Sequence, residues 1–336
     1  MESIIRHLLL KLDPERAHAI AQQLLRLRGF FPYKTPVYPR TVFGLSFQNP
    51  VGLAAGWDKD AACIDGLFRL GFGFVEVGTV TPKPQMGNEK PRLFRIPEKF
   101  ALINRMGFNN AGVDALVEKI KVRKTPGILG VNIGKNKETV LEKAVDDYQL
   151  CLKAVYPYAD YVVVNISSPN TPGLRELQSD HYLKNLLQDL TRLKKNLAGV
   201  LNRDVPLLVK TTVDFPEKNV STFVETLIDF DIAGVVISNT TLDHSAVEGC
   251  LHAKEAGGLS GAPLRARVSS MIKAVHTISE KKLSIIGVGG ILNAEDSLSH
   301  LRAGASLVQI FSGFVYRGSP LIAEILDSIC YKDPSA

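Results

Sequence analysis

The stretch Tyr161–Gly173, with the sequence YVVVNISSPNTPG, decides the fold and points to a site. Its first four residues form an apolar, β-branched run that predicts a buried strand. Asn165 ends this run, and two serines, a second asparagine and a threonine follow. Two prolines and a glycine restrict the backbone of this loop. Taken alone, the stretch is more typical of a polar turn, but other strands of the chain end in the same way.

Short apolar runs and helical stretches alternate eight times after residue 40. The runs span residues 51–55, 74–78, 128–133, 161–165, 207–211, 234–238, 284–288 and 307–311. The longer helical stretches span residues 111–122, 138–156, 182–201, 263–279 and 294–303. This alternation predicts an α/β fold, a (β/α)8 TIM barrel. A doubly wound sheet is the alternative, but no GxGxxG motif follows the first run, which disfavours its dinucleotide-binding form.

Residues 1–28 form a separate unit of two short amphipathic helices with basic flanks. Asp13 is the expected N-cap of the second helix, Pro14 lies in its first turn, and Gly29 ends it. Residues 29–40 contain three prolines and predict an extended linker. We therefore expect an N-terminal helical unit at residues 1–40 and a barrel at residues 41–336. Periodicity alone favours a helical hairpin packed on its own domain over a membrane-interface segment.

The composition fits a soluble globular protein of 336 residues with 45% hydrophobic and 22% charged residues. A net charge of +6 favours anionic small molecules or an anionic membrane surface. Sparse aromatics and the lack of a basic tract argue against nucleic-acid partners. No apolar run approaches the ~20 residues of a membrane span, and the N-terminus lacks a signal-peptide pattern. The four dispersed cysteines predict reduced thiols and no metal site.

The predicted strands carry polar residues or glycines at their carboxyl ends, which lie on one face of a barrel. The glycine pair at residues 289–290 and the Ser-Gly pair at residues 312–313 are typical of a phosphate site. The segment 79–110 after the second strand is far longer than the usual ~2–6 residues and predicts a cover over the site. Lys59 and Lys210 could pair with an anion, and Lys210 also permits a Schiff-base aldolase. The asparagines fit a planar heterocycle better.

These residues occur in motifs that resemble dihydroorotate dehydrogenases over nearly the whole chain. The motifs are NPVGLAAG at 49–56, DKD at 58–60, GTVTP at 78–82, NRMGFNN at 104–110, NISSPNTPGLR at 165–175, GGLSG at 257–261 and IGVGGI at 286–291. Ser168 stands where class 1 enzymes carry a catalytic cysteine, and a helical N-terminal extension is present. Both features resemble the quinone-dependent class 2.

The resemblance implies an FMN-dependent enzyme that oxidises (S)-dihydroorotate to orotate with a quinone acceptor, in de novo pyrimidine biosynthesis. Ser168 would be the general base that takes the proton from C5 of dihydroorotate. The FMN-binding residues implied are Ala55, Gly56, Trp57, Asp58, Lys59, Thr79, Asn132, Asn165, Lys210, Ser238, Gly261, Gly290, Phe311 and Ser312. The substrate-binding residues implied are Lys59, Asn104, Arg105, Met106, Gly107, Phe108, Asn165, Asn170, Asn239 and Thr240.

The resemblance also changes the expectation for residues 1–28, which become a quinone entrance and a peripheral membrane contact at the cytoplasmic face of the cell membrane. His18 and Arg95 would line the quinone route, and we expect a monomer. Phe311 stands where the family usually has tyrosine, and Ser238 replaces a threonine. Residues 211–214 lack a proline common in the family. Three alternatives remain: another flavin barrel that acts on a different pyrimidine or uses NAD, the aldolase, and a non-catalytic membrane-binding module.

Overall fold

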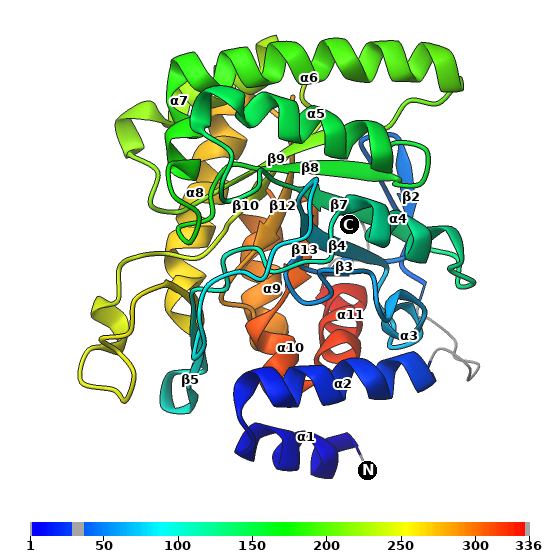
Figure 1. The fold of residues 1–336 in the computed structure, drawn as a ribbon. Helices are drawn as coiled ribbons and strands as arrows, with labels where there is room; N and C mark the ends of the chain where they lie inside the picture. The colour runs from blue at the N-terminus through cyan, green and yellow to red at the C-terminus, as the bar shows by residue number, and fades with distance from the viewer. Residues whose placement is uncertain (1, 29–36, 333–336) are drawn as a thin grey trace.

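The computed structural model describes residues 2–28 and 37–332, and its centre is a closed barrel of eight parallel strands (Figure 1). The strands follow one another around the barrel in chain order: β3 (Val51–Leu53), β4 (Phe74–Val80), β7 (Ile128–Ile133), β8 (Tyr161–Asn165), β9 (Leu207–Thr211), β10 (Gly234–Ile237), β12 (Ser284–Val288) and β13 (Leu307–Ile310). The TIM barrel predicted from the sequence is confirmed. β3, β10 and β13 end one or two residues earlier than predicted, and β4 ends two residues later.

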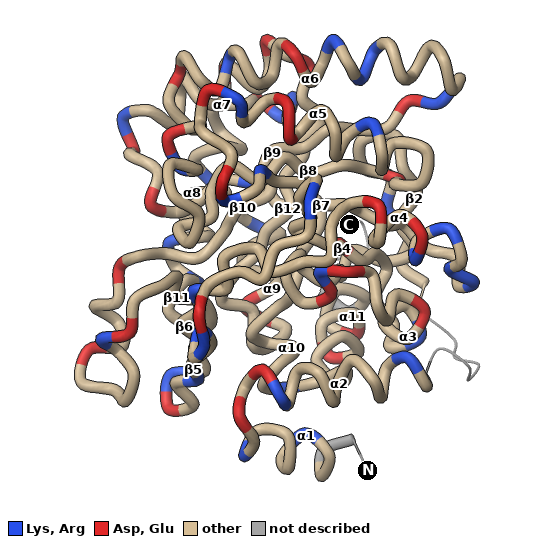
Figure 2. Tube along the Cα trace, in the orientation of Figure 1, with Lys and Arg blue, Asp and Glu red and all other residues tan. Residues whose placement is uncertain are grey.

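Helices surround the barrel because each carries one apolar face toward it. They are α3 (Ile64–Phe68), α4 (Val113–Lys121), α5 (Ala144–Val155), α6 (Asp180–Leu201), α7 (Val220–Asp229), α8 (Arg265–Ser279), α9 (Ala294–Arg302), α10 (Ser312–Arg317) and α11 (Pro320–Lys332). Single 3-10 turns are η1 (Pro97–Lys99), η2 (Leu141–Lys143), η3 (Leu174–Gln178), η4 (Glu217–Asn219), η5 (Ser245–Val247) and η6 (Ala262–Leu264). Acidic and basic residues are interspersed over these outer helices (Figure 2).

Two small sheets were not predicted. The hairpin of β1 (Arg40–Val42) and β2 (Leu45–Phe47) packs beneath the barrel, where the Phe47 ring meets Phe74 edge-on at 5.2 Å. The strands β5 (Leu93–Ile96), β6 (Ala101–Asn104) and β11 (Gly258–Gly261) form an antiparallel sheet. This sheet joins the long segment after β4 to the segment after β10. The two loops on the carboxyl face of the barrel therefore form a single cover over it.

The N-terminal helices α1 (Glu2–Lys11) and α2 (Pro14–Arg28) lie together against one side of the barrel (Figure 1). Asp13 caps α2 as predicted, since its carboxylate accepts a bond from the Arg16 amide at 3.0 Å. α2 is anchored by the Glu15–Arg92 ion pair and by the His18 ring against Trp57 at 4.8 Å. The predicted helix end at Gly29 and most of the predicted linker lie outside the described residues.

One face of this helical pair packs on the barrel and the other is exposed and apolar. The exposed side chains include Ile4, Leu8, Leu12, Ile20, Leu24 and Leu27. Within residues 2–28 and 37–332, no helix combines the length and apolar character needed to span a bilayer. The same residues contain no group of three or more His, Cys, Asp and Glu placed to bind a metal. The four cysteines are free; Cys63 and Cys151 are buried, whereas Cys330 is exposed.

Candidate active site

A cavity of about 1400 Å³ opens at the carboxyl ends of the barrel strands and continues to α1 and α2. Its lining includes all but three of the site residues predicted from the sequence. Those lining residues are Ala55, Gly56, Trp57, Lys59, Thr79, Asn104, Met106, Gly107, Phe108, Asn165, Ser168, Asn170, Lys210, Ser238, Asn239, Thr240, Gly261, Gly290, Phe311 and Ser312. The fold thus gathers residues from most of the strand ends and from the cover around one space.

Asp58, Arg105 and Asn132 do not line the cavity. Asp58 is buried under α3, where its carboxylate accepts bonds from the Ala62 and Cys63 amides at 2.7 and 2.9 Å. Arg105 turns outward, pairs with Glu255 at 2.8 Å and stacks over Phe94. These two side chains hold the backbone of the motifs in place instead of facing the cavity.

Asn132 lies one layer deeper, inside the barrel. Its Oδ1 accepts bonds from Thr79 Oγ1 at 2.5 Å and from Asn165 Nδ2 at 3.2 Å. Asn165 in turn uses its Oδ1 to accept from the Ser167 amide at 3.2 Å and from Asn239 Nδ2 at 3.4 Å. The wall of the cavity at β4, β7, β8 and β10 is therefore one continuous hydrogen-bonded network.

Ser168 is buried on the loop after β8, at the cavity lining. Its Oγ accepts a bond from the Asn170 amide at 3.3 Å, and no other described group bonds to it. Asn170 Nδ2 donates to the backbone oxygen of Asn104 at 3.0 Å, which ties the serine loop to β6. The hydroxyl of Thr171 is buried without a partner among the described residues.

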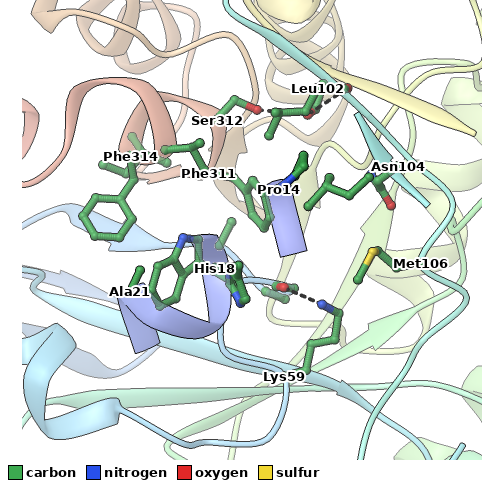
Figure 3. Close-up of a pocket in the computed structure, with 18 of the residues that line it drawn as sticks. Pro14, His18, Ala21, Lys59, Leu102, Asn104, Met106, Phe311, Ser312 and Phe314 are labelled. Atoms are coloured by element: carbon green, nitrogen blue, oxygen red, sulfur yellow. Dashed lines mark hydrogen bonds between the residues drawn. The ribbon is translucent and has the colours of Figure 1, made fainter. Parts of the chain in front are cut away.

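Two lysines, Lys59 and Lys210, place positive charge in the cavity near the ends of the barrel strands. Burial lowers the pKa of Lys59 to about 8, although the neighbouring Asp60 opposes this effect. Lys59 Nζ donates to the Gly56 carbonyl at 2.9 Å and faces the cavity beside His18 (Figure 3). Burial also lowers the pKa of Lys210, which the carboxylate of Glu76 partly offsets. The side chain of Lys210 donates no hydrogen bond to a described residue, so its ammonium is available to a ligand.

The outer part of the cavity is formed by the N-terminal helices. Pro14, His18 and Ala21 of α2 face the same space as Phe311 and Phe314 (Figure 3). Burial and the charge of Lys59 lower the pKa of His18 to about 4, so this imidazole is neutral at pH 7. Arg95 also lines this region and donates to the Leu10 and Leu12 carbonyls. Burial lowers the pKa of Arg95.

Sequence reasoning missed Gln309, Arg175 and Glu76. Gln309 lines the cavity and its Oε1 is buried without a partner among the described residues. Arg175 fixes the serine loop by donating to the Ser167 carbonyl at 3.2 Å. Gln309 and Glu76 each interrupt an otherwise apolar strand, at FVEV and LVQI. A charged or amide side chain in a strand buried on both faces is the signal that could have identified Gln309 and Glu76.

Comparison with known proteins agrees with this geometry. The family model described as dihydroorotate dehydrogenase matches residues 38–332. A protein of Alkalilimnicola ehrlichii named dihydroorotate dehydrogenase (quinone) is 50% identical over 98% of this chain and 99% of its own length. The protein of the same name from Stenotrophomonas maltophilia is 49% identical over 98% and 96%.

A solved structure gives the same result. The crystal structure of DHODH from Eimeria tenella in complex with ferulenol superposes with a TM-score of 0.89 at 35% identity, covering 97% of this chain and 93% of that one. The ligand-free form from the same organism gives a TM-score of 0.88, also at 35% identity. The chain therefore belongs to the dihydroorotate dehydrogenase family, in its quinone-linked class 2.

Proposed function

We propose that this protein oxidises (S)-dihydroorotate to orotate with FMN as its cofactor and passes the electrons to a membrane quinone, as a step of pyrimidine biosynthesis. One observation carries the proposal. The buried hydroxyl of Ser168 shares a cavity with Lys59 and with the amides of Asn104, Asn170 and Asn239. A base, a cation and several amides around one space fit a small anionic heterocycle that loses a proton during its oxidation.

The residues present fit FMN. Lys210 is buried and its ammonium donates no hydrogen bond to a described residue. Gln309 Oε1 is buried and has no partner among these residues. Gly261 and Gly290 have φ of +103° and +76°, and a Cβ on Gly290 would lie 2.5 Å from the backbone of Arg265. Such bare backbone is typical of phosphate sites at the ends of barrel strands. FMN, when bound, supplies the hydride acceptor and the route for electrons to the quinone.

Lys59 would hold the carboxylate of dihydroorotate, and the asparagine amides would bond to the polar ring edge. Ser168 would take the proton from C5. A serine hydroxyl is a weak base at neutral pH, so this step requires a positioned, water-poor site. The cover formed by β5, β6 and β11 would keep water away from Ser168, which is only 5% exposed. Lys210 would stabilise negative charge on the reduced cofactor.

The apolar arm of the cavity between α1 and α2 is the proposed quinone entrance. Leu9, Leu10, Ala21, Leu24 and Leu25 line it. The exposed apolar side chains on the same helices would contact the membrane from its cytoplasmic face without spanning it. Residues 1–40 would thus act as the quinone and membrane unit, residues 41–336 as the catalytic barrel, and the protein as a monomer.

The absorption spectrum tests the proposal most directly. Purified protein should be yellow, and dihydroorotate should bleach the flavin bands without oxygen. Adding a short-chain quinone should restore the bands, whereas NAD should not. Colourless protein that cannot be reconstituted with FMN would refute the flavin assignment, and recovery of the bands by NAD would favour a different flavin barrel.

A further inference from the structure

Glu76 is a buried carboxylate that the proposed mechanism does not use. It lies on β4 inside the barrel, beneath the cavity, and its side chain has no exposed surface. Three side chains donate to it: Asn132 Nδ2 at 2.8 Å, Gln309 Nε2 at 2.7 Å and the Tyr161 hydroxyl at 3.3 Å. Burying a charge in this way is costly unless hydrogen bonds satisfy it. Lys210 supplies a compensating positive charge nearby.

An ionised carboxylate only accepts hydrogen bonds, so it dictates which end of a neighbouring amide faces it. Asn132 must turn its NH₂ group toward Glu76, and its Oδ1 therefore points up to Thr79 and Asn165. Asn165 must then present its own NH₂ group downward. Its Oδ1 is left facing the Ser167 amide and Asn239.

The end of this hydrogen-bond chain nearest the cavity is also fixed, because backbone donors lie there. The backbone amides of Ser167 and Thr240 can only donate, and they donate to Asn165 Oδ1 at 3.2 Å and Asn239 Oδ1 at 2.8 Å. Every amide between the carboxylate and these backbone groups has one orientation that satisfies both ends. Asn165 and Asn239 line the cavity. The amide orientation that Glu76 fixes therefore decides whether each presents oxygen or nitrogen to a ligand.

We propose that Glu76 is a positioning residue of this active site, which fixes Asn132 and, through it, the Thr79 hydroxyl and the Asn165 amide at the cavity wall. This inference rests on the proposed function, because it assumes that Thr79 and Asn165 meet the ligands. Glu76 itself does not line the cavity, although it contacts Gln309, which does.

Exchanging the carboxylate of Glu76 and the amide of Asn132 between the two positions tests the proposal. In Asn132→Asp, two carboxylates would face each other, and repulsion should displace Thr79 and Asn165. Adding Glu76→Gln restores the pattern, because the new amide can donate to the carboxylate introduced at position 132 and accept from Gln309 and Tyr161. That carboxylate can still accept from Thr79 and Asn165, and the net charge of the barrel interior returns to its original value.

We expect N132D to raise KM for dihydroorotate and the Kd of orotate, read from the flavin spectrum of the holoenzyme, by roughly tenfold or more. E76Q alone should do less, since glutamine can still accept from Asn132. The double variant should recover most of both values. Tyr161→Phe is the matched control: it removes the longest bond to Glu76 and leaves the chain to Asn165 intact, so KM and Kd should not change.

Unchanged KM and Kd in N132D would overturn the proposal. So would a double variant that binds flavin and melts like the original protein but stays as impaired as N132D. N132D alone could fail to fold or to retain flavin. In that case, recovery of folding and flavin binding when E76Q is added supports the proposal, and no recovery contradicts it. A failure of the proposed function is distinguishable, because the unsubstituted protein would then not be reduced by dihydroorotate.

Discussion

The side-chain amide of Asn170 donates to Asn104 at both its backbone oxygen, 3.0 Å away, and its Oδ1, 3.3 Å away. These residues are 66 positions apart in the chain. Asn170 belongs to the loop that carries Ser168, and Asn104 ends strand β6 of the cover. The serine loop and the cover are therefore one unit, and a ligand beneath them is enclosed by both.

Replacing Ser168 with alanine should remove the proposed base. We expect the rate of flavin bleaching by dihydroorotate to fall by about 10²–10⁴-fold, the usual contribution of a positioned base. Orotate should still perturb the flavin spectrum, because Lys59 and the amides remain. Stopped-flow absorbance without oxygen measures the rate, and fast bleaching in S168A would exclude Ser168 as the base.

The charge of Lys59 should set the alkaline limit of substrate binding. Its pKa is lowered to about 8 by burial, so the ammonium is present below that pH and is lost above it. We expect kcat/KM for dihydroorotate to fall as the pH rises through about 8, since the neutral amine no longer pairs with the carboxylate. Lys59→Met should lower kcat/KM at pH 7 and abolish this alkaline limb. A limb that persists unchanged in K59M would assign it to another group.

The exposed apolar face of α1 and α2 should bind membranes. Leu8 and Leu27 are 58% and 60% exposed, and burying each in lipid would contribute roughly 1.5–3 kcal/mol. Leu8→Asp combined with Leu27→Asp should therefore lower co-sedimentation with anionic vesicles at least tenfold without slowing flavin bleaching. Val200→Asp is the control, since Val200 is 82% exposed on α6, on the far side of the molecule from α1 (Figure 1). Equal losses in both variants would contradict this docking face.

Arg175 should hold the serine loop in its working position. Besides Ser167, it contacts Asp214 at 3.0 Å and the Thr240 carbonyl at 3.1 Å. We expect Arg175→Lys, which lacks the planar fork, to lower kcat by about 10–100-fold while the protein retains flavin. Arg192→Ala removes a surface ion pair with Asp189 and should leave kcat unchanged. An unchanged kcat in R175K would show that the loop is held by its other contacts.

The eight barrel strands were predictable because each is buried on both faces. Such strands are continuous β-branched runs, and the predicted and observed bounds agree at both ends for β7, β8, β9 and β12. The strands β1, β2, β5, β6 and β11 were missed. Each has only three or four residues, and the pairing of β11 with β6, for example Gly258 with Asn104, joins segments more than 150 residues apart. No local periodicity reports a partner at that distance.

The sequence by itself determined that polar residues end the strands of a barrel, and its motifs carried the family resemblance. Only the tertiary structure decided where each side chain points. Asp58 and Lys59 are neighbours in one motif, yet Asp58 binds the backbone just before α3 and Lys59 faces the cavity. Likewise, Glu76 on β4 contacts Asn132 on β7 and Gln309 on β13 only because these strands lie together in the barrel. The physical reason is that hydrogen bonds and burial depend on neighbours in space, which the closed barrel brings together from distant parts of the chain.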